Sequence, residues 1–308
     1  MANKIFKTLD EQIEILRQRG LIIEDEEKAK KILFKENYFF INGYRHFFTG
    51  SYKDNNFLPG TTFDELYSIF TFDRKIRNIF FKNILIVENN IKSIISYRLS
   101  KNYGYKEKNY LNPENFSQDA MKVRQVNDVL SKMKRQIRLN GKKHSATMHY
   151  ITNYGYIPMW ILVKVLSFGI VSELYNILKI DDQIKIADFY GLEVETLVIY
   201  LSILANFRNL CAHEDILYDY RTQRMIPDDI IHKRLQIEKV SDYYKYGKND
   251  LFALLIILKY MLSEEEFREL YNELGYEIDL LEGKAKVLEI DSILDKIGFP
   301  INWREIIE

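Results

Sequence analysis

The residues best suited to chemistry lie in the segment 201–221, LSILANFRNLCAHEDILYDYR. Arg208 supplies a guanidinium, which stays charged and can bind a phosphate through two parallel hydrogen bonds. His213 supplies an imidazole, and a histidine can accept or release a proton near neutral pH. Asn209 lies between them in the sequence and could orient the imidazole or the phosphate. These three side chains predict an acid/base site that cleaves a phosphodiester.

RNA is the phosphodiester that suits such a site, because its own 2′-hydroxyl can serve as the nucleophile. His213 could take the proton of that hydroxyl or give one to the leaving 5′-oxygen, while Arg208 offsets charge in the transition state. We therefore expect neither a metal ion nor another cofactor. The sequence also lacks GxGxxG and GxxxxGK[ST] loops, has one cysteine, and has five histidines without the HExxH spacing.

A polar stripe runs beside an apolar line on the helix that we expect over residues 193–213. The apolar line consists of Leu197, Leu201, Leu204 and Cys211. The polar stripe consists of Ser202, Asn206, Asn209 and His213. Arg208 falls on the apolar line, so its charge needs a partner. A buried polar stripe on so apolar a helix predicts that something occupies it.

Helix geometry leaves the assembly of this site open. Residues five apart are about 140° apart around an ideal helix, so Arg208 and His213 cannot both point at one phosphate. Either the helix opens near Ala212, or two copies of the helix face each other in a symmetric dimer. In a purely structural interpretation, a buried arginine and histidine only stabilise the helix end. A similar spacing links Arg138 to His144, which we discount because that segment contains a glycine and is rich in lysine.

The elements that position these residues are expected to be helices. Apolar residues recur at spacings of three and four, and 13 glycines and 5 prolines leave few breakers. An unbroken pattern predicts a long core helix over residues 72–101, with Glu88 and Lys92 paired one turn apart. Two capping boxes, Thr8 with Glu11 and Thr62 with Glu65, predict helix starts. The fold class is therefore all-α.

We expect one helical unit over residues 1–308 rather than separate domains. No repeat and no Gly/Ser- or Pro-rich linker divides the chain. Within the unit, we assign an N-terminal helical extension to residues 1–55, a helical bundle core to 56–222 and a C-terminal helical region to 223–308. With 47% hydrophobic residues, the chain has ample apolar surface to bury.

Positive charge is concentrated in the basic segment 122–144, although 44 basic and 44 acidic residues give a net charge of zero. Eight lysines and arginines between positions 122 and 143 stand against one acidic residue, Asp128. On a helix they would form a stripe that follows a phosphate backbone, although a solvated face is the simpler interpretation. The candidate RNA-binding residues are Lys132, Lys134, Arg135, Arg138, Lys142 and Lys143.

The sequence predicts a cytoplasmic protein that is not associated with a membrane. Its longest apolar run, residues 251–258, is well short of the roughly 20 residues that span a bilayer. The start, MANKIFKTLDEQ, has acidic residues where a secretory signal would be apolar. A single cysteine, Cys211, rules out a disulfide framework within one chain.

The motif RNLCAH at residues 208–213 resembles the R-N-x-x-x-H form of the motif of HEPN domains (higher eukaryotes and prokaryotes nucleotide-binding). The wider chain resembles the Abi-like abortive-infection proteins of the AbiD and AbiF type. Four segments carry this resemblance: FKTLDEQIEILRQRGL (6–21), NYFFINGYRHFF (37–48), FDRKIRNIFFKNILIVENNIKSII (72–95) and PMWILVKVLSFGIVSELY (158–175). It covers most of residues 6–221.

The resemblance implies a HEPN-like helical core that forms a homodimer. It also implies a metal-independent endoribonuclease that leaves a 2′,3′-cyclic phosphate and acts in phage defence, as abortive-infection or toxin–antitoxin systems do. Arg208, Asn209 and His213 match the motif positions directly. Two alternatives stay open: a non-catalytic module that binds a structured noncoding RNA, and a structural dimer whose polar stripe satisfies itself.

The resemblance assigns no role to Arg45, Arg77 or Glu88. We expect each of them to have a structural role in the core.

Overall fold

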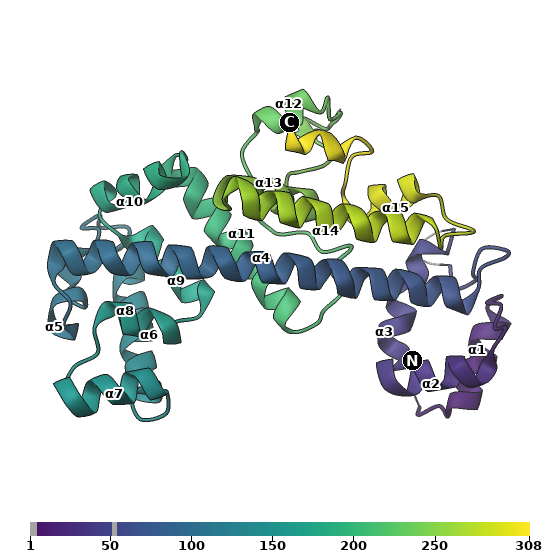
Figure 1. The fold of residues 1–308 in the computed structure, drawn as a ribbon, viewed down its shortest axis with the longest axis horizontal. Coiled ribbons are helices and arrows are strands. Elements are labelled where there is room, and N and C mark those ends of the chain that lie inside the picture. Colours follow the sequence, from purple (N-terminus) through teal and green to yellow (C-terminus); the bar gives the residue numbers. More distant parts are fainter. Residues whose placement is uncertain (1–4, 51–53) are drawn as a thin grey trace.

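The computed structural model describes residues 5–50 and 54–308, and helices dominate this part of the chain (Figure 1). The predicted all-α fold class is confirmed. Residues 1–4 and 51–53 of the predicted N-terminal extension, with the first residues of the start that we inspected for a signal, lie outside the described residues. The buried hydrophobic side chains of the described part form one cluster.

One long helix, α4 (Phe63–Tyr103), runs through the whole molecule (Figure 1). It begins earlier than the predicted residue 72, because Leu66, Ile69 and Phe70 extend the buried apolar pattern toward the N-terminus. Different groups of helices pack on it along its length, so its buried side chains do not form one narrow stripe.

Only one of the two predicted capping boxes forms. Thr8 caps α1 by accepting a hydrogen bond from the amide of Glu11, and the Glu11 carboxylate accepts one from the amide of Thr8. At α4, Thr62 accepts from the amide of Glu65 over 3.2 Å, but the Glu65 carboxylate does not return to Thr62. Its Oε1 accepts instead from three successive amides, those of residues 286–288. The capping-box prediction was wrong here because a distant segment competes for the carboxylate.

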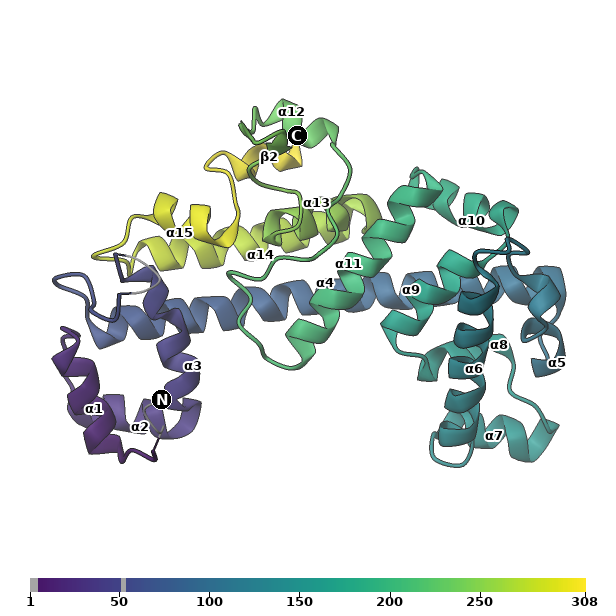
Figure 2. The same cartoon turned by 180° about the vertical axis from the view of Figure 1, so that it is seen from behind.

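Three groups of helices surround α4 (Figure 2). Near its Phe63 end lie α1 (Leu9–Gln18), α2 (Glu26–Glu36), α3 (Tyr38–Gly43) and the 3₁₀ turn η1 (Tyr44–Phe47), which together we call the N-terminal lobe. Near its Tyr103 end lie α5 (Glu107–Tyr110), η2 (Pro113–Asn115), α6 (Val123–Asn140), α7 (Ser145–Tyr154), α8 (Met159–Leu162), η3 (Val163–Val165), α9 (Phe168–Ile177), α10 (Ile180–Ala187) and η4 (Asp188–Tyr190).

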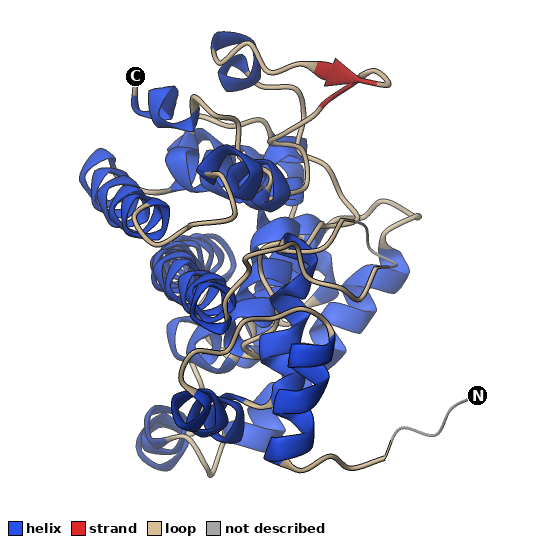
Figure 3. Cartoon of the chain, turned by 90° about the vertical axis from the view of Figure 1, so that its right-hand side faces the viewer, coloured by secondary structure: helices blue, strands red, loops and turns tan. Residues whose placement is uncertain are grey.

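The third group is C-terminal and packs along the side of α4. It contains α12 (Ile230–Arg234), α13 (Leu251–Met261), α14 (Glu264–Glu282), α15 (Ile290–Ile297) and η5 (Trp303–Ile307). Strands β1 (Lys239–Val240) and β2 (Tyr243–Tyr244) form an antiparallel hairpin in which Lys239 lies opposite Tyr244, the only sheet in the described part of the chain (Figure 3). The apolar run 251–258 is fully buried within α13.

Helix α11 (Val194–Ala212) crosses α4 near the middle of that long helix. This confirms the helix predicted over residues 193–213, and it packs against both α4 and α9. Among the described helices, α11 alone is long and apolar enough to span a membrane, judged by length and composition. Burial between two neighbouring helices accounts for the same apolar sequence.

Candidate functional site

The end of α11 places His213 where the helix opens. The last helical residue is Ala212, and His213 follows as the C-cap with φ −92° and ψ 2°. Glu214 then adopts a left-handed conformation with φ 57°. The amide of Glu214 donates to the carbonyl of Cys211, and the amide of Asp215 donates to that of Leu210, each over 3.2 Å. This is the Schellman arrangement, in which the chain turns sharply away from the helix axis.

Arg208 has a carboxylate partner on the long helix. Its Nε donates to Oε2 of Glu88 over 3.2 Å, and the other carboxylate oxygen of Glu88 accepts from Nζ of Lys92 over 2.6 Å. The Glu88 side chain is 5% exposed, whereas that of Arg208 is 30% exposed. The guanidinium is therefore fixed at its Nε edge, and no further hydrogen bond holds it within residues 5–50 and 54–308.

His213 and Asn209 are both exposed at the surface of this chain. Asn206 is exposed as well, and Ser202 is half-buried. The prediction of a buried polar stripe was therefore wrong, since α11 presents most of that stripe to the outside. The structural interpretation that needs a buried histidine at the helix end fails for the same reason. An exposed imidazole can reach a ligand or a second copy of the chain.

The segment that follows His213 is fixed to α4 by a buried cluster. Oδ2 of Asp73 accepts from the amide of Leu217 over 3.1 Å, from the Tyr44 hydroxyl over 2.7 Å and from Nη1 of Arg77 over 3.1 Å. The same Nη1 donates to the carbonyl of Asp215 over 3.0 Å. Burial raises the pKa of Asp73 to about 6. These bonds fix the backbone two to four residues beyond the imidazole.

Sequence reasoning missed Asp73 and could not pair Glu88 with Arg208. Both acids stand four residues before a basic residue on α4, namely Arg77 and Lys92, and that spacing is visible in the sequence. What the spacing cannot show is the second partner, which comes from a segment far along the chain. Arg77 and Glu88 are buried within the molecule, as residues with a structural role would be.

A model of the family described as Abi-like protein matches residues 31–219, which is more than half of the chain and includes the whole segment 208–213. The chain belongs to the Abi-like protein family. Membership supports a role in abortive infection. No curated protein and no solved structure shows a significant match to the chain.

In this Abi-like protein the basic segment lies on α6 and in the turn that follows it. Lys134, Arg135 and Arg138 are exposed on α6, and Lys142 and Lys143 are exposed in the turn. Lys132 differs from them, because its Nζ lies 2.8 Å from carboxylate oxygens of both Asp128 and Glu173. Two acidic groups therefore already compensate its charge.

The structure of this Abi-like protein does not bring the basic segment next to His213 within one chain. Helix α6 lies near the Tyr103 end of α4, whereas α11 ends near the middle of α4, and both views show them apart along the long axis (Figure 1, Figure 2). An RNA that touches both would have to extend along the molecule. As for metals, the described residues include no group of three or more His, Cys, Asp or Glu side chains able to hold an ion.

Proposed function

We propose that this Abi-like protein is a metal-independent endoribonuclease of a phage-defence system of the abortive-infection or toxin–antitoxin type. We also propose that its core is HEPN-like, of the AbiD and AbiF type. The observation that carries the proposal is the open end of α11, where Glu88 holds Arg208 in place and His213 lies exposed. Arg208 supplies a guanidinium held in place, and His213 supplies an exposed imidazole that can transfer a proton. Cleavage by the 2′-hydroxyl needs both groups.

Each side chain has a defined role in this reaction. His213 takes the proton from the 2′-hydroxyl, whose oxygen attacks phosphorus and forms the 2′,3′-cyclic phosphate. The bond from phosphorus to the 5′-oxygen breaks, and a protonated imidazole gives the leaving oxygen its proton. The guanidinium of Arg208 offsets the negative charge on the phosphoryl oxygens, and Asn209 orients the phosphate.

A homodimer is part of this proposal. Cleavage needs both a proton acceptor and a proton donor, and two copies of α11 facing each other would supply two imidazoles and two guanidiniums. The exposed polar stripe on an otherwise apolar helix supports that arrangement, because polar side chains tolerate a wet, symmetric contact. We place the reaction in the cytoplasm, where RNA is available.

The decisive experiment measures RNA cleavage by the purified protein in EDTA. Cleavage should continue without divalent metal and should end in 2′,3′-cyclic phosphates. His213→Ala should lose cleavage while its circular dichroism and RNA affinity stay unchanged, because the side chain is exposed. His149→Ala is the matched control, since His149 is another exposed histidine, on α7 and outside the motif. Cleavage by His213→Ala at the wild-type rate would remove His213 from the mechanism.

The exposed charges on α6 favour a second candidate function, a non-catalytic module that binds a structured noncoding RNA. Tight, salt-dependent RNA binding by the wild-type protein with no cleavage products under any metal condition would select this alternative.

A further inference from the structure

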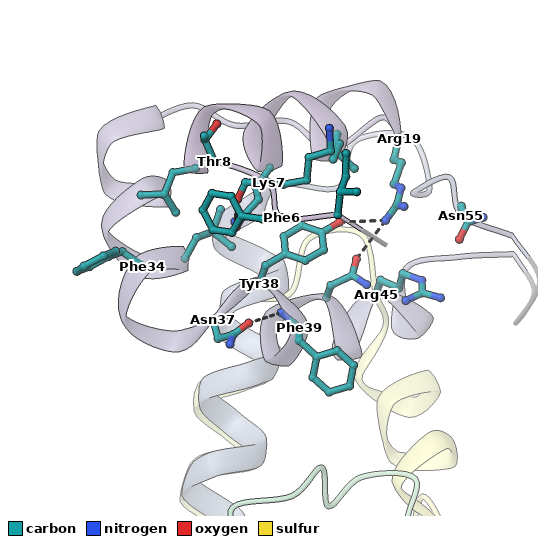
Figure 4. Close-up of a pocket in the computed structure, with 16 residues that line it drawn as sticks. Phe6, Lys7, Thr8, Arg19, Phe34, Asn37, Tyr38, Phe39, Arg45 and Asn55 are labelled. Atoms are coloured by element: carbon teal, nitrogen blue, oxygen red, sulfur yellow. Dashed lines mark hydrogen bonds between the residues drawn. The ribbon is translucent and has the colours of Figure 1, made fainter. Parts of the chain in front are cut away.

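A large cavity opens among α1, α2 and α3 in the N-terminal lobe (Figure 4). Its volume is about 1080 Å³, slightly above the roughly 300–1,000 Å³ of most small-ligand pockets. The apolar part of its wall consists of Ile5, Phe6, Leu9, Ile15, Leu33, Phe34, Tyr38 and Phe39. Phe6, Phe34 and Phe39 are each more than 70% exposed, so several ring faces are open for contact.

Two arginines give this cavity a positive end. Figure 4 shows Arg19 and Arg45 on the same side as Asn55, with Phe6 and Phe34 toward the other side and Tyr38 between them. None of the described residues that line the cavity is acidic. Lys7, the other cation among the described lining residues, already has a carboxylate partner, because its Nζ lies 3.0 Å from Oε1 of Glu11.

Neither arginine has an acidic partner in the part of the chain that the structure describes. Nη1 of Arg19 donates to the Tyr38 hydroxyl over 3.2 Å and to Oδ1 of Asn42 over 3.4 Å, and both acceptors are neutral. Nε of Arg45 is buried, and no acceptor reaches it among residues 5–50 and 54–308. A guanidinium without an acidic partner can pair with an added anion, and an anion between Arg19 and Arg45 would accept hydrogen bonds from both.

We propose that this cavity binds a small organic anion with a planar aromatic body. Its charged group lies between Arg19 and Arg45, where guanidinium forks match a carboxylate, sulfonate or phosphate. Its ring lies against Tyr38 and Phe6, whose rings offer faces and edges for aromatic contact. The site is separate from Arg208 and His213 and does not depend on the proposed nuclease activity.

Two dyes that differ in charge test the proposal on the full chain. The first probe is 1-anilinonaphthalene-8-sulfonate, an aromatic anion, and the second is N-phenyl-1-naphthylamine, which keeps the rings but lacks the sulfonate. Fluorescence titration of the wild-type protein should show saturable binding of one equivalent of the anionic dye. Arg45→Met should weaken that binding about tenfold or more and leave the neutral dye unaffected.

Two further variants separate the site from general charge and folding effects. Arg135→Met/Arg138→Met removes two exposed charges from α6 and should leave both dyes unaffected. Arg45→Lys keeps the charge and should retain most of the affinity for the anionic dye. The buried Nε of Arg45 has no hydrogen-bond partner among the described residues, so Arg45→Met should fold normally, as circular dichroism will show.

Equal affinity of the wild-type protein and Arg45→Met for the anionic dye would overturn the proposal. Dye binding that weakens as protein concentration and self-association rise would assign the cavity to a contact between copies and would overturn it as well.

Discussion

Glu88 on α4 accepts a hydrogen bond from Nε of Arg208 on α11 over 3.2 Å, although 120 positions separate them in the sequence. The Arg208 guanidinium also lies over the ring of Phe81 at 5.9 Å. A guanidinium held through its Nε–H is restricted in orientation, and its Nη groups keep donors for a ligand. The motif arginine is thus held before any ligand arrives.

A mutation of Glu88 tests how much its contacts with Arg208 and Lys92 contribute to stability. Glu88→Gln leaves Lys92, whose side chain is 11% exposed, and Arg208 without a carboxylate. We expect the free energy of unfolding to fall by roughly 3 kcal/mol in urea titrations. Glu264→Gln breaks the exposed pair with Arg268 and should change stability by less than about 0.5 kcal/mol. If both variants lost the same small amount, the buried pairing would not matter for stability.

Asp73 should make stability depend on pH. Its pKa is about 6 in the folded chain because of burial, against about 3.9 for an exposed aspartate. The folded state therefore binds this proton more tightly, so the contribution of Asp73 is greatest below about pH 4 and declines as pH rises to about 6. We expect the stability advantage of the wild-type protein over Asp73→Asn to shrink by about 2 kcal/mol between pH 4 and pH 7.

Urea unfolding of both proteins at several pH values measures that difference. Burial also raises the pKa of Asp250 to about 6, but Asp250 is present in both proteins and cancels in the comparison. If the difference in free energy of unfolding between the two proteins stayed constant across this pH range, Asp73 would not cause the pH dependence.

Glu214 occupies a backbone conformation that suits glycine. Its φ of 57° is left-handed, which costs an ordinary residue about 1 kcal/mol or more. Glu214→Gly should therefore raise the free energy of unfolding by roughly 0.5 kcal/mol, because added chain entropy offsets part of the gain. Gly191 allows the opposite substitution as a control, because its φ is 63° and no atom lies within 4 Å of an added Cβ. Gly191→Ala should lower stability; a loss in both variants would mean that the Glu214 side chain makes a stabilising contact.

Lys134 and Lys132 should differ in their contribution to RNA affinity. Lys134 is exposed, whereas Lys132 already contacts two carboxylates. For a single-stranded RNA, Lys134→Met should reduce the slope of log affinity against log salt by about 0.7, and Lys132→Met should change it less. Fluorescence anisotropy at several salt concentrations measures the slope. An equal reduction of the slope in both variants would show that RNA displaces the carboxylates from Lys132.

Local patterns were sufficient to predict the helices but not their partners. The spacing of apolar residues predicted α11 to within a residue at each end, and Thr8 with Glu11 predicted the start of α1. Glu65 shows where such reasoning stops. The predicted donor to the Glu65 carboxylate was the amide of Thr62. The amides that donate to it lie more than 200 positions away in the sequence. Tertiary packing brings the Glu65 carboxylate to these amides, and no residue near Glu65 in the sequence indicates that contact.

The same limit applies to the candidate site: its residues could be predicted from the sequence, but their partners could not. Arg208, Asn209 and His213 could be named from the sequence, and the need of Arg208 for a partner followed from its place on an apolar line. The identity of that partner depends on how α11 crosses α4, which the spacing of residues within either helix does not contain. The exposure of the polar stripe likewise depends on which faces of α11 the neighbouring helices cover.

The single oxygen Oδ2 of Asp73 joins η1, α4 and the chain beyond His213. Gly43, at the end of α3, touches the same region, because a Cβ there would come within 2.6 Å of the Ile216 side chain, and its carbonyl accepts from the Tyr218 hydroxyl. The N-terminal lobe and the segment that follows His213 consequently share one buried set of contacts. Repacking of the N-terminal lobe would therefore act on the backbone next to His213 at the middle of α4.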